Sequence, residues 1–65
     1  MNIAEALPIE QARVRKLLPL YDEIPEGIFA ATMMRQSLAQ AEKAAAAGDL
    51  VAMIHAYEDL KGYSA

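Results

Sequence analysis

The sequence has 65 residues, of which 55% are hydrophobic, and its formal net charge is −3 at pH 7. Such a length allows one domain, and a core of that size usually needs a disulfide, a metal or a partner chain for stability. The chain has no cysteine and a single histidine. This excludes disulfides and argues against a structural zinc site. Association with a partner chain is therefore the expected source of additional stability.

The composition also limits the cellular locations and the classes of partner that we expect. The N-terminus has neither the basic segment nor the long apolar segment of a signal peptide, and no apolar run approaches the ~20 residues of a membrane span. We therefore expect a cytoplasmic protein that does not bind membranes. Its net negative charge argues against nucleic acid as a partner.

The first predicted helix covers residues 8–21. Pro8 suits the first turn of a helix, and Glu10 interacts favourably with the helix dipole there. An apolar stripe follows at helical spacing: Val14, Leu17, Leu18 and Tyr21. Pro19 interrupts this pattern, so the helix either stops just before it or bends and continues. Residues 1–7 are a candidate N-terminal arm, or a short extra turn on the core.

The central predicted helix covers residues 25–47, from Pro25 to the alanine run before Gly48. Its inward stripe is expected to contain the following residues: Ala30, Met33, Met34, Ser37, Leu38, Ala41, Ala44 and Ala45. From Ile28 to Met34 the sequence is apolar in nearly every direction around the axis, whereas the later inward positions are mostly alanine. A helix that is apolar on all sides is normally buried on all sides.

The dipeptide Gly48-Asp49 predicts a helix stop and an immediate restart. Glycine supplies a left-handed cap, and the aspartate side chain accepts hydrogen bonds from the first N–H groups of the next helix. That helix is predicted over residues 49–61, with an apolar stripe at helical spacing: Leu50, Met53, Ile54, Tyr57 and Leu60. The short link predicts an antiparallel helical hairpin.

Residues 48–60 resemble the turn and second helix of a tetratricopeptide unit, with Met53 and Tyr57 at the spacing of its Ala-x3-Phe pair. The Trp, Leu-Gly and Tyr pattern of that unit's first helix is absent upstream. The resemblance therefore implies a helical hairpin and no repeat array.

Three groups of polar residues are candidate chemical sites. His55 and Asp59 have the i,i+4 spacing of an acid–base pair or of two metal ligands, but they lack a nucleophile or a further ligand. The acidic group Asp22, Glu23 and Glu26 matches no calcium or di-metal motif. The basic group Arg13, Arg15 and Lys16 has no glycine-rich loop or aromatic platform beside it. We interpret all three as solvated surface and predict no catalytic, cofactor or metal site.

The apolar first half of the central helix is the most informative feature for function. Apolar side chains point to several sides of the helix here, and two short neighbouring helices are too few to bury all of them. Methionine side chains also adapt to irregular partner surfaces. The predicted interaction surface consists of Ile28, Phe29, Met33, Met34 and Val51. Packing of Phe29, Met33 and Met34 inside one monomer is the alternative.

The sequence thus predicts an all-α, single-domain, three-helix protein over residues 1–65, completed as a homodimer. The expected function is a non-enzymatic protein–protein interaction or regulatory module. One alternative is a small acidic inhibitor, of the kind that phages and plasmids encode, which would block a basic protein. A metal-binding or enzymatic role around His55 is the second alternative.

Overall fold

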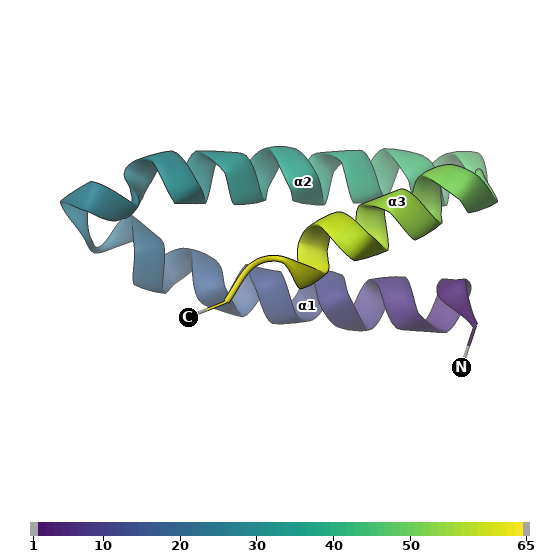
Figure 1. Cartoon of the computed structure of the whole chain (residues 1–65), viewed down its shortest axis with the longest axis horizontal. Helices are drawn as coiled ribbons and strands as arrows, with labels where there is room; N and C mark the ends of the chain where they lie inside the picture. The colour runs from purple at the N-terminus through teal and green to yellow at the C-terminus, as the bar shows by residue number, and fades with distance from the viewer. Residues whose placement is uncertain (1, 65) are drawn as a thin grey trace.

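The computed structural model describes residues 2–64, which form three α-helices and one short 3-10 turn. Figure 1 shows two long helices, α1 and α2, lying alongside each other, with the shorter α3 inclined across them. The molecule is 36 Å long and 19 by 15 Å across. The prediction of an all-α protein with three packed helices is confirmed.

Helix α1 (Ile3–Asp22) begins five residues before the predicted start. Its N-cap is Asn2, whose side-chain oxygen accepts a hydrogen bond from the Glu5 N–H at 3.0 Å. The predicted helix start at Pro8 was therefore wrong. Of the two outcomes expected for residues 1–7, an extra turn on the core is the one observed for residues 3–7, since Leu7 is buried in the core and Ile3 packs against it; Met1 lies outside the described residues. The spacing of Asn2 and Glu5 matches the positions used in a capping box, which was the local signal for this start.

Helix α1 contains both Pro8 and Pro19 and continues through Pro19 to Asp22. Figure 1 shows its last turns rising toward α2. Of the two outcomes expected at Pro19, continuation with a bend is therefore the one observed. A proline inside a helix commonly produces such a bend because it removes a backbone hydrogen bond.

The 3-10 turn η1 (Pro25–Gly27) precedes α2 (Ile28–Ala47). The predicted helix over residues 25–47 thus begins with one tighter turn. Gly27 is buried, and a Cβ atom placed on it would lie 2.3 Å from the backbone oxygen of Tyr21. Only glycine therefore fits at this point, where the 3-10 turn packs against the backbone at the end of α1.

Gly48 and Asp49 link α2 to α3 (Leu50–Lys61) as the sequence predicts. Gly48 adopts the left-handed conformation, with φ of 65°. The Asp49 side chain accepts a hydrogen bond from the N–H of Ala52 at 3.1 Å. From this link α3 runs back along the molecule toward α1 (Figure 1).

The three helices meet in one apolar core, whose buried members are Leu7, Val14, Met34, Leu38, Ala41, Ala44, Met53, Ala56 and Leu60. The inward face of α3 differs from the predicted stripe, because Leu50 and Ile54 are exposed whereas Ala56 is buried. The small Ala56 side chain faces the core, and its size permits close approach of α2.

The chain end after α3 is held by α1 and α2. The Arg13 guanidinium donates hydrogen bonds to the backbone oxygens of Leu60 at 2.9 Å and Tyr63 at 2.8 Å. The Tyr63 hydroxyl lies 2.9 Å from the Ser37 hydroxyl, and the Tyr21 hydroxyl donates to the backbone oxygen of Ser64. Helix α3 therefore ends opposite the middle of α2.

We expect Met34→Ala and Met33→Ala to differ sharply in their free energy of unfolding. Met34 is 1% exposed, and truncation in a closed core costs about 2–5 kcal/mol. Met33 is 41% exposed, so its truncation should cost less than about 1 kcal/mol. Urea denaturation at low protein concentration, followed by circular dichroism, measures both. Equal losses would contradict the placement of these side chains.

We also expect Gly27→Ala to destabilise the chain more than Gly48→Ala. The first change forces a methyl group against backbone and should cost at least about 2 kcal/mol. Gly48→Ala only places a side chain in the left-handed region of backbone conformation, which should lower the free energy of unfolding by about 1–2 kcal/mol. Gly48→Asn is the control, because asparagine tolerates that region better. A neutral Gly27→Ala in thermal or urea denaturation would refute the close crossing.

Candidate interaction surface

Three of the predicted surface residues lie together in the first turns of α2. Ile28 is 60% exposed, Phe29 77% and Met33 41%. An exposed phenylalanine of this degree, flanked by two further exposed apolar side chains, is the kind of feature that marks interaction surfaces. Packing inside one monomer, the alternative for Phe29 and Met33, is not what the structure shows.

The other two predicted residues do not lie with them. Met34 is buried in the core, because a step of one residue turns the side chain by about 100° around the helix. Val51 is exposed, but it lies in the first turn of α3, next to the opposite end of α2. About 27 Å of helix separates Phe29 from the end of α2, at 1.5 Å per residue.

Two further exposed residues near the start of α2 were missed by the sequence analysis. Leu20 lies in the last turn of α1, and Ile24 precedes the 3-10 turn. Leu20 falls outside the apolar stripe of its helix, which was the available signal. We refer to the exposed apolar residues around the α1–α2 connection as the turn-end group: Leu20, Ile24, Ile28, Phe29 and Met33.

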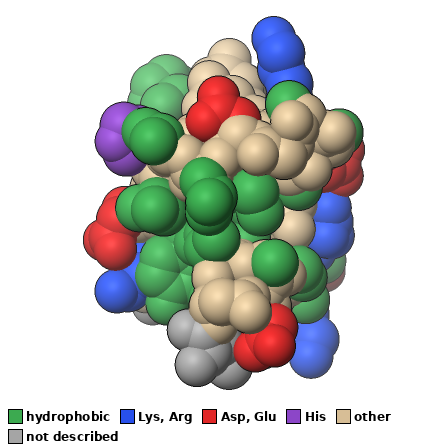
Figure 2. Space-filling view, turned by 90° about the vertical axis from the view of Figure 1, so that its right-hand side faces the viewer, with side chains coloured by type: hydrophobic (Ala, Val, Ile, Leu, Met, Phe, Trp, Pro, Cys, Tyr) green, Lys and Arg blue, Asp and Glu red, His purple; other side chains and the backbone are tan. Residues whose placement is uncertain are grey.

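A second exposed apolar group lies at the other end of the molecule, in the first turns of α3. It consists of Leu50, Val51 and Ile54. Figure 2 looks at this end of the molecule and shows hydrophobic side chains gathered across its middle. The molecule therefore presents apolar side chains at both ends of its long axis.

One outer face of α2 connects the turn-end group to α3. At 100° per residue, a single stripe about 80° wide contains six residues: Phe29, Met33, Gln36, Gln40, Ala44 and Ala47. Five of them are exposed, and Ala44, at the edge of the stripe, is buried. The charged residues Arg35 and Glu42 point elsewhere, since they pair with Asp22 and Arg15 of α1 at 2.5 and 2.8 Å. The stripe itself contains no charged residue.

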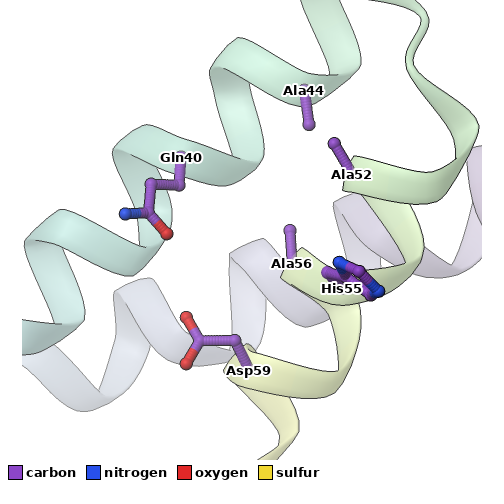
Figure 3. Close-up of a pocket in the computed structure, with 6 residues that line it drawn as sticks. All are labelled: Gln40, Ala44, Ala52, His55, Ala56 and Asp59. Carbon is purple, nitrogen blue, oxygen red and sulfur yellow. The ribbon is translucent and has the colours of Figure 1, made fainter.

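The far half of this stripe borders a hollow of about 350 Å³ between α2 and α3. Its walls are formed by Gln40, Ala44, Ala52, His55, Ala56 and Asp59. Figure 3 shows Ala44 and Ala52 pointing toward each other at one end, with Gln40 and Asp59 at the other. A smaller hollow of about 190 Å³ continues toward the Gly48-Asp49 link and shares three of these residues.

The structure places His55 and Asp59 on the rim of the larger hollow. No hydrogen bond or ion pair joins their side chains in residues 2–64, and that part of the chain holds no group of three metal-ligating side chains.

The arginines of the predicted basic group are engaged within the molecule. Arg13 pairs with Glu10 at 2.8 Å in addition to its backbone contacts, and Arg15 pairs with Glu42. Asp22, from the acidic group, pairs with Arg35. Such partly exposed pairs contribute little to stability, but they leave fewer charges available to an external partner.

Comparisons with protein-family models, with curated proteins and with solved structures gave no match to this chain. Within the described residues, no helix combines the length and the apolar character needed to cross a bilayer.

We expect Zn²⁺ to leave the thermal unfolding midpoint of the chain unchanged, and His55→Ala to have no effect on it. A ligand that binds the folded state raises the midpoint in proportion to ln(1 + [L]/Kd). Differential scanning fluorimetry with and without a chelator makes the measurement. A zinc-dependent rise that His55→Ala abolishes would revive the metal-binding alternative.

Proposed function

We propose that this protein is a non-enzymatic interaction module that acts as a homodimer through the turn-end group and the outer face of α2. The single observation that carries the proposal is the exposure of Phe29 among other apolar side chains. In this proposal α2 and α3 form an antiparallel hairpin that presents the surface, and α1 supports it from behind.

The exposed apolar area supports an interface of ordinary size. With roughly 200 Å² for a fully exposed large apolar residue, the exposures of the turn-end group amount to about 550 Å². A specific interface buries ~800 Å² per partner, and homodimer interfaces are ~65% apolar. The turn-end group as a whole therefore exposes about that apolar area; Phe29 and Met33 lie on the outer stripe of α2, whereas Ile28 is turned by about 100° from Phe29.

The distribution of charge favours a second copy as the partner. A two-fold interface places the same surface on both sides, so a charge near the axis meets its own like charge. The stripe from Phe29 to Gln40 avoids this conflict because it is uncharged. Lys43 borders the stripe, but in a pair centred on Gln36 the two copies of Lys43 would stand about 20 Å apart, beyond the screening length of ~8 Å.

A second candidate function, an acidic inhibitor of a basic protein, is favoured by one observation. All three arginines form ion pairs, which leaves six carboxylates without an ion pair to another residue in 2–64, against three lysines. The six are Glu5, Glu23, Glu26, Asp49, Glu58 and Asp59. A partner held by these charges would bind with strong salt dependence.

We expect Phe29→Ser to weaken self-association at least 30-fold. Truncating an aromatic residue at the centre of an interface typically costs about 2 kcal/mol or more of binding free energy. In a two-fold dimer the substitution is present in both subunits, so both copies of this contact are lost. Sedimentation equilibrium between micromolar and millimolar concentrations measures the dissociation constant.

Ile9→Ser is the matched control, since Ile9 is a similarly exposed apolar residue on α1. It should leave the dissociation constant unchanged. A wild-type chain that stays monomeric over this range, or equal dissociation constants for Phe29→Ser and wild type, would refute the homodimer. Association that weakens steeply with salt would favour the charge-based alternative.

A further inference from the structure

The outer stripe of α2 is graded in side-chain size along the helix. Phe29 and Met33 occupy its start, Gln36 and Gln40 its middle, and alanines its last two turns. These positions follow each other at steps of three and four residues, so they share one face. Large side chains at one end and small ones at the other make this face complementary to its own copy in the antiparallel direction.

The third helix reinforces this complementarity because it covers only half of α2. Tyr63 contacts Ser37, near the midpoint of α2, and the chain then turns to α1 at Ser64. The large residues Phe29 and Met33 thus lie beyond the reach of α3. The small residues Ala44 and Ala47 lie beside it, where the hollows between α2 and α3 open.

We propose that two copies pair their α2 helices antiparallel about a two-fold axis beside Gln36, so that Phe29 of each copy fills the α2–α3 hollow of the other. This inference rests on the proposed homodimer and specifies its geometry. With the axis between positions 36 and 37, Phe29 lies opposite Ala44 of the partner subunit and Met33 lies opposite Gln40 of the partner subunit. Both Phe29 and Ala44 are then about 11 Å from the axis, at 1.5 Å per residue.

The hollow has a suitable size and lining for this side chain. An enclosed apolar cavity of about 150 Å³ accommodates a benzene ring, and the larger hollow, which is open to solvent on one side, measures about 350 Å³. Ala44, Ala52 and Ala56 provide apolar wall, while Gln40, His55 and Asp59 form a polar rim. An aromatic anchor in an apolar pocket with a polar rim is the usual arrangement at the centre of an interface.

The first test fills the hollow from within the same chain. Ala52→Phe should weaken self-association at least tenfold, because the new ring takes the space that Phe29 of the partner subunit occupies. Adding Phe29→Ala to Ala52→Phe should restore part of the affinity, since one ring again fills each hollow. Ala46→Phe, on an exposed position of α2 outside the stripe, is the control and should change nothing.

Circular dichroism and the urea midpoint show whether each variant is folded. An Ala52→Phe variant that is folded and dimerises like wild type would overturn the proposal. So would a double variant whose loss equals the sum of the two single losses, since residues that do not touch behave additively.

A second test does not depend on filling the hollow. The chain has no cysteine, so Gln36→Cys introduces a single thiol beside the proposed axis. Disulfide formation requires Cα atoms within about 7 Å, and we expect this variant to form covalent dimers under mild oxidation at least tenfold faster than Ala12→Cys. Ala12 is an exposed residue on α1 and serves as the control.

The outcomes separate this geometry from the proposed function. A wild-type dimer in which Gln36→Cys and Ala12→Cys cross-link at equal rates would retain the homodimer and overturn the antiparallel α2 pairing. A monomeric wild-type chain would overturn both.

Discussion

The structure depends on the short length of its third helix. Helix α3 has 12 residues, whereas α1 and α2 have 20 each, which corresponds to about 18 Å against about 30 Å of helix. Three helices therefore enclose a core only in the half of the molecule that contains the Gly48-Asp49 link. In the other half α1 and α2 have only each other: Ala31 and Met34 are still buried there, but Phe29 and Met33 remain exposed.

The point at which α3 ends is fixed by polar contacts. The Arg13 guanidinium donates one hydrogen bond to the backbone oxygen of Leu60, in the last turn of α3, and one to the backbone oxygen of Tyr63. Carbonyl groups at a helix end have few partners within the helix, so such donors stabilise it. The Tyr63 hydroxyl then meets Ser37 on α2. These contacts hold α1, α2 and the chain end together at the border between the closed and the open half. In the proposed dimer, the open half of each copy faces the hollow beside α3 of the other.

The sequence predicted the helices and the link well, because the signals are local. Periodic apolar residues, Gly48 and Asp49 determine those elements through spacing and backbone chemistry. The predicted start of the first helix was wrong because Pro8 suits a first turn, whereas here Asn2 caps the helix earlier and Pro8 lies inside it at the cost of one backbone hydrogen bond. The exposure of Leu50 and Ile54 and the burial of Ala56 depend on how closely α2 and α3 approach, which no local pattern states.

Part of the candidate surface was also predictable, because its signal is local in the sequence. The sequence shows that residues 28–34 carry more apolar side chains than one face of a helix can bury. That Met34 is buried and Phe29 and Met33 are exposed depends on which side of α2 faces α1 and α3. Val51 was grouped with them although it lies at the far end of the molecule. The hollow was not foreseeable, because residues from two helices that are far apart along the chain form its walls.

The central claim is that Phe29 is exposed in one copy and covered in two. Nuclear Overhauser effects between chains, measured in a sample that mixes isotope-labelled and unlabelled protein, test it directly. The account predicts cross-peaks between the Phe29 ring of one copy and the methyl groups of Ala44 and Ala52 of the partner subunit. A dimer in which the Phe29 ring shows no contact between chains, or contacts only the turn-end group of the other copy, would contradict it.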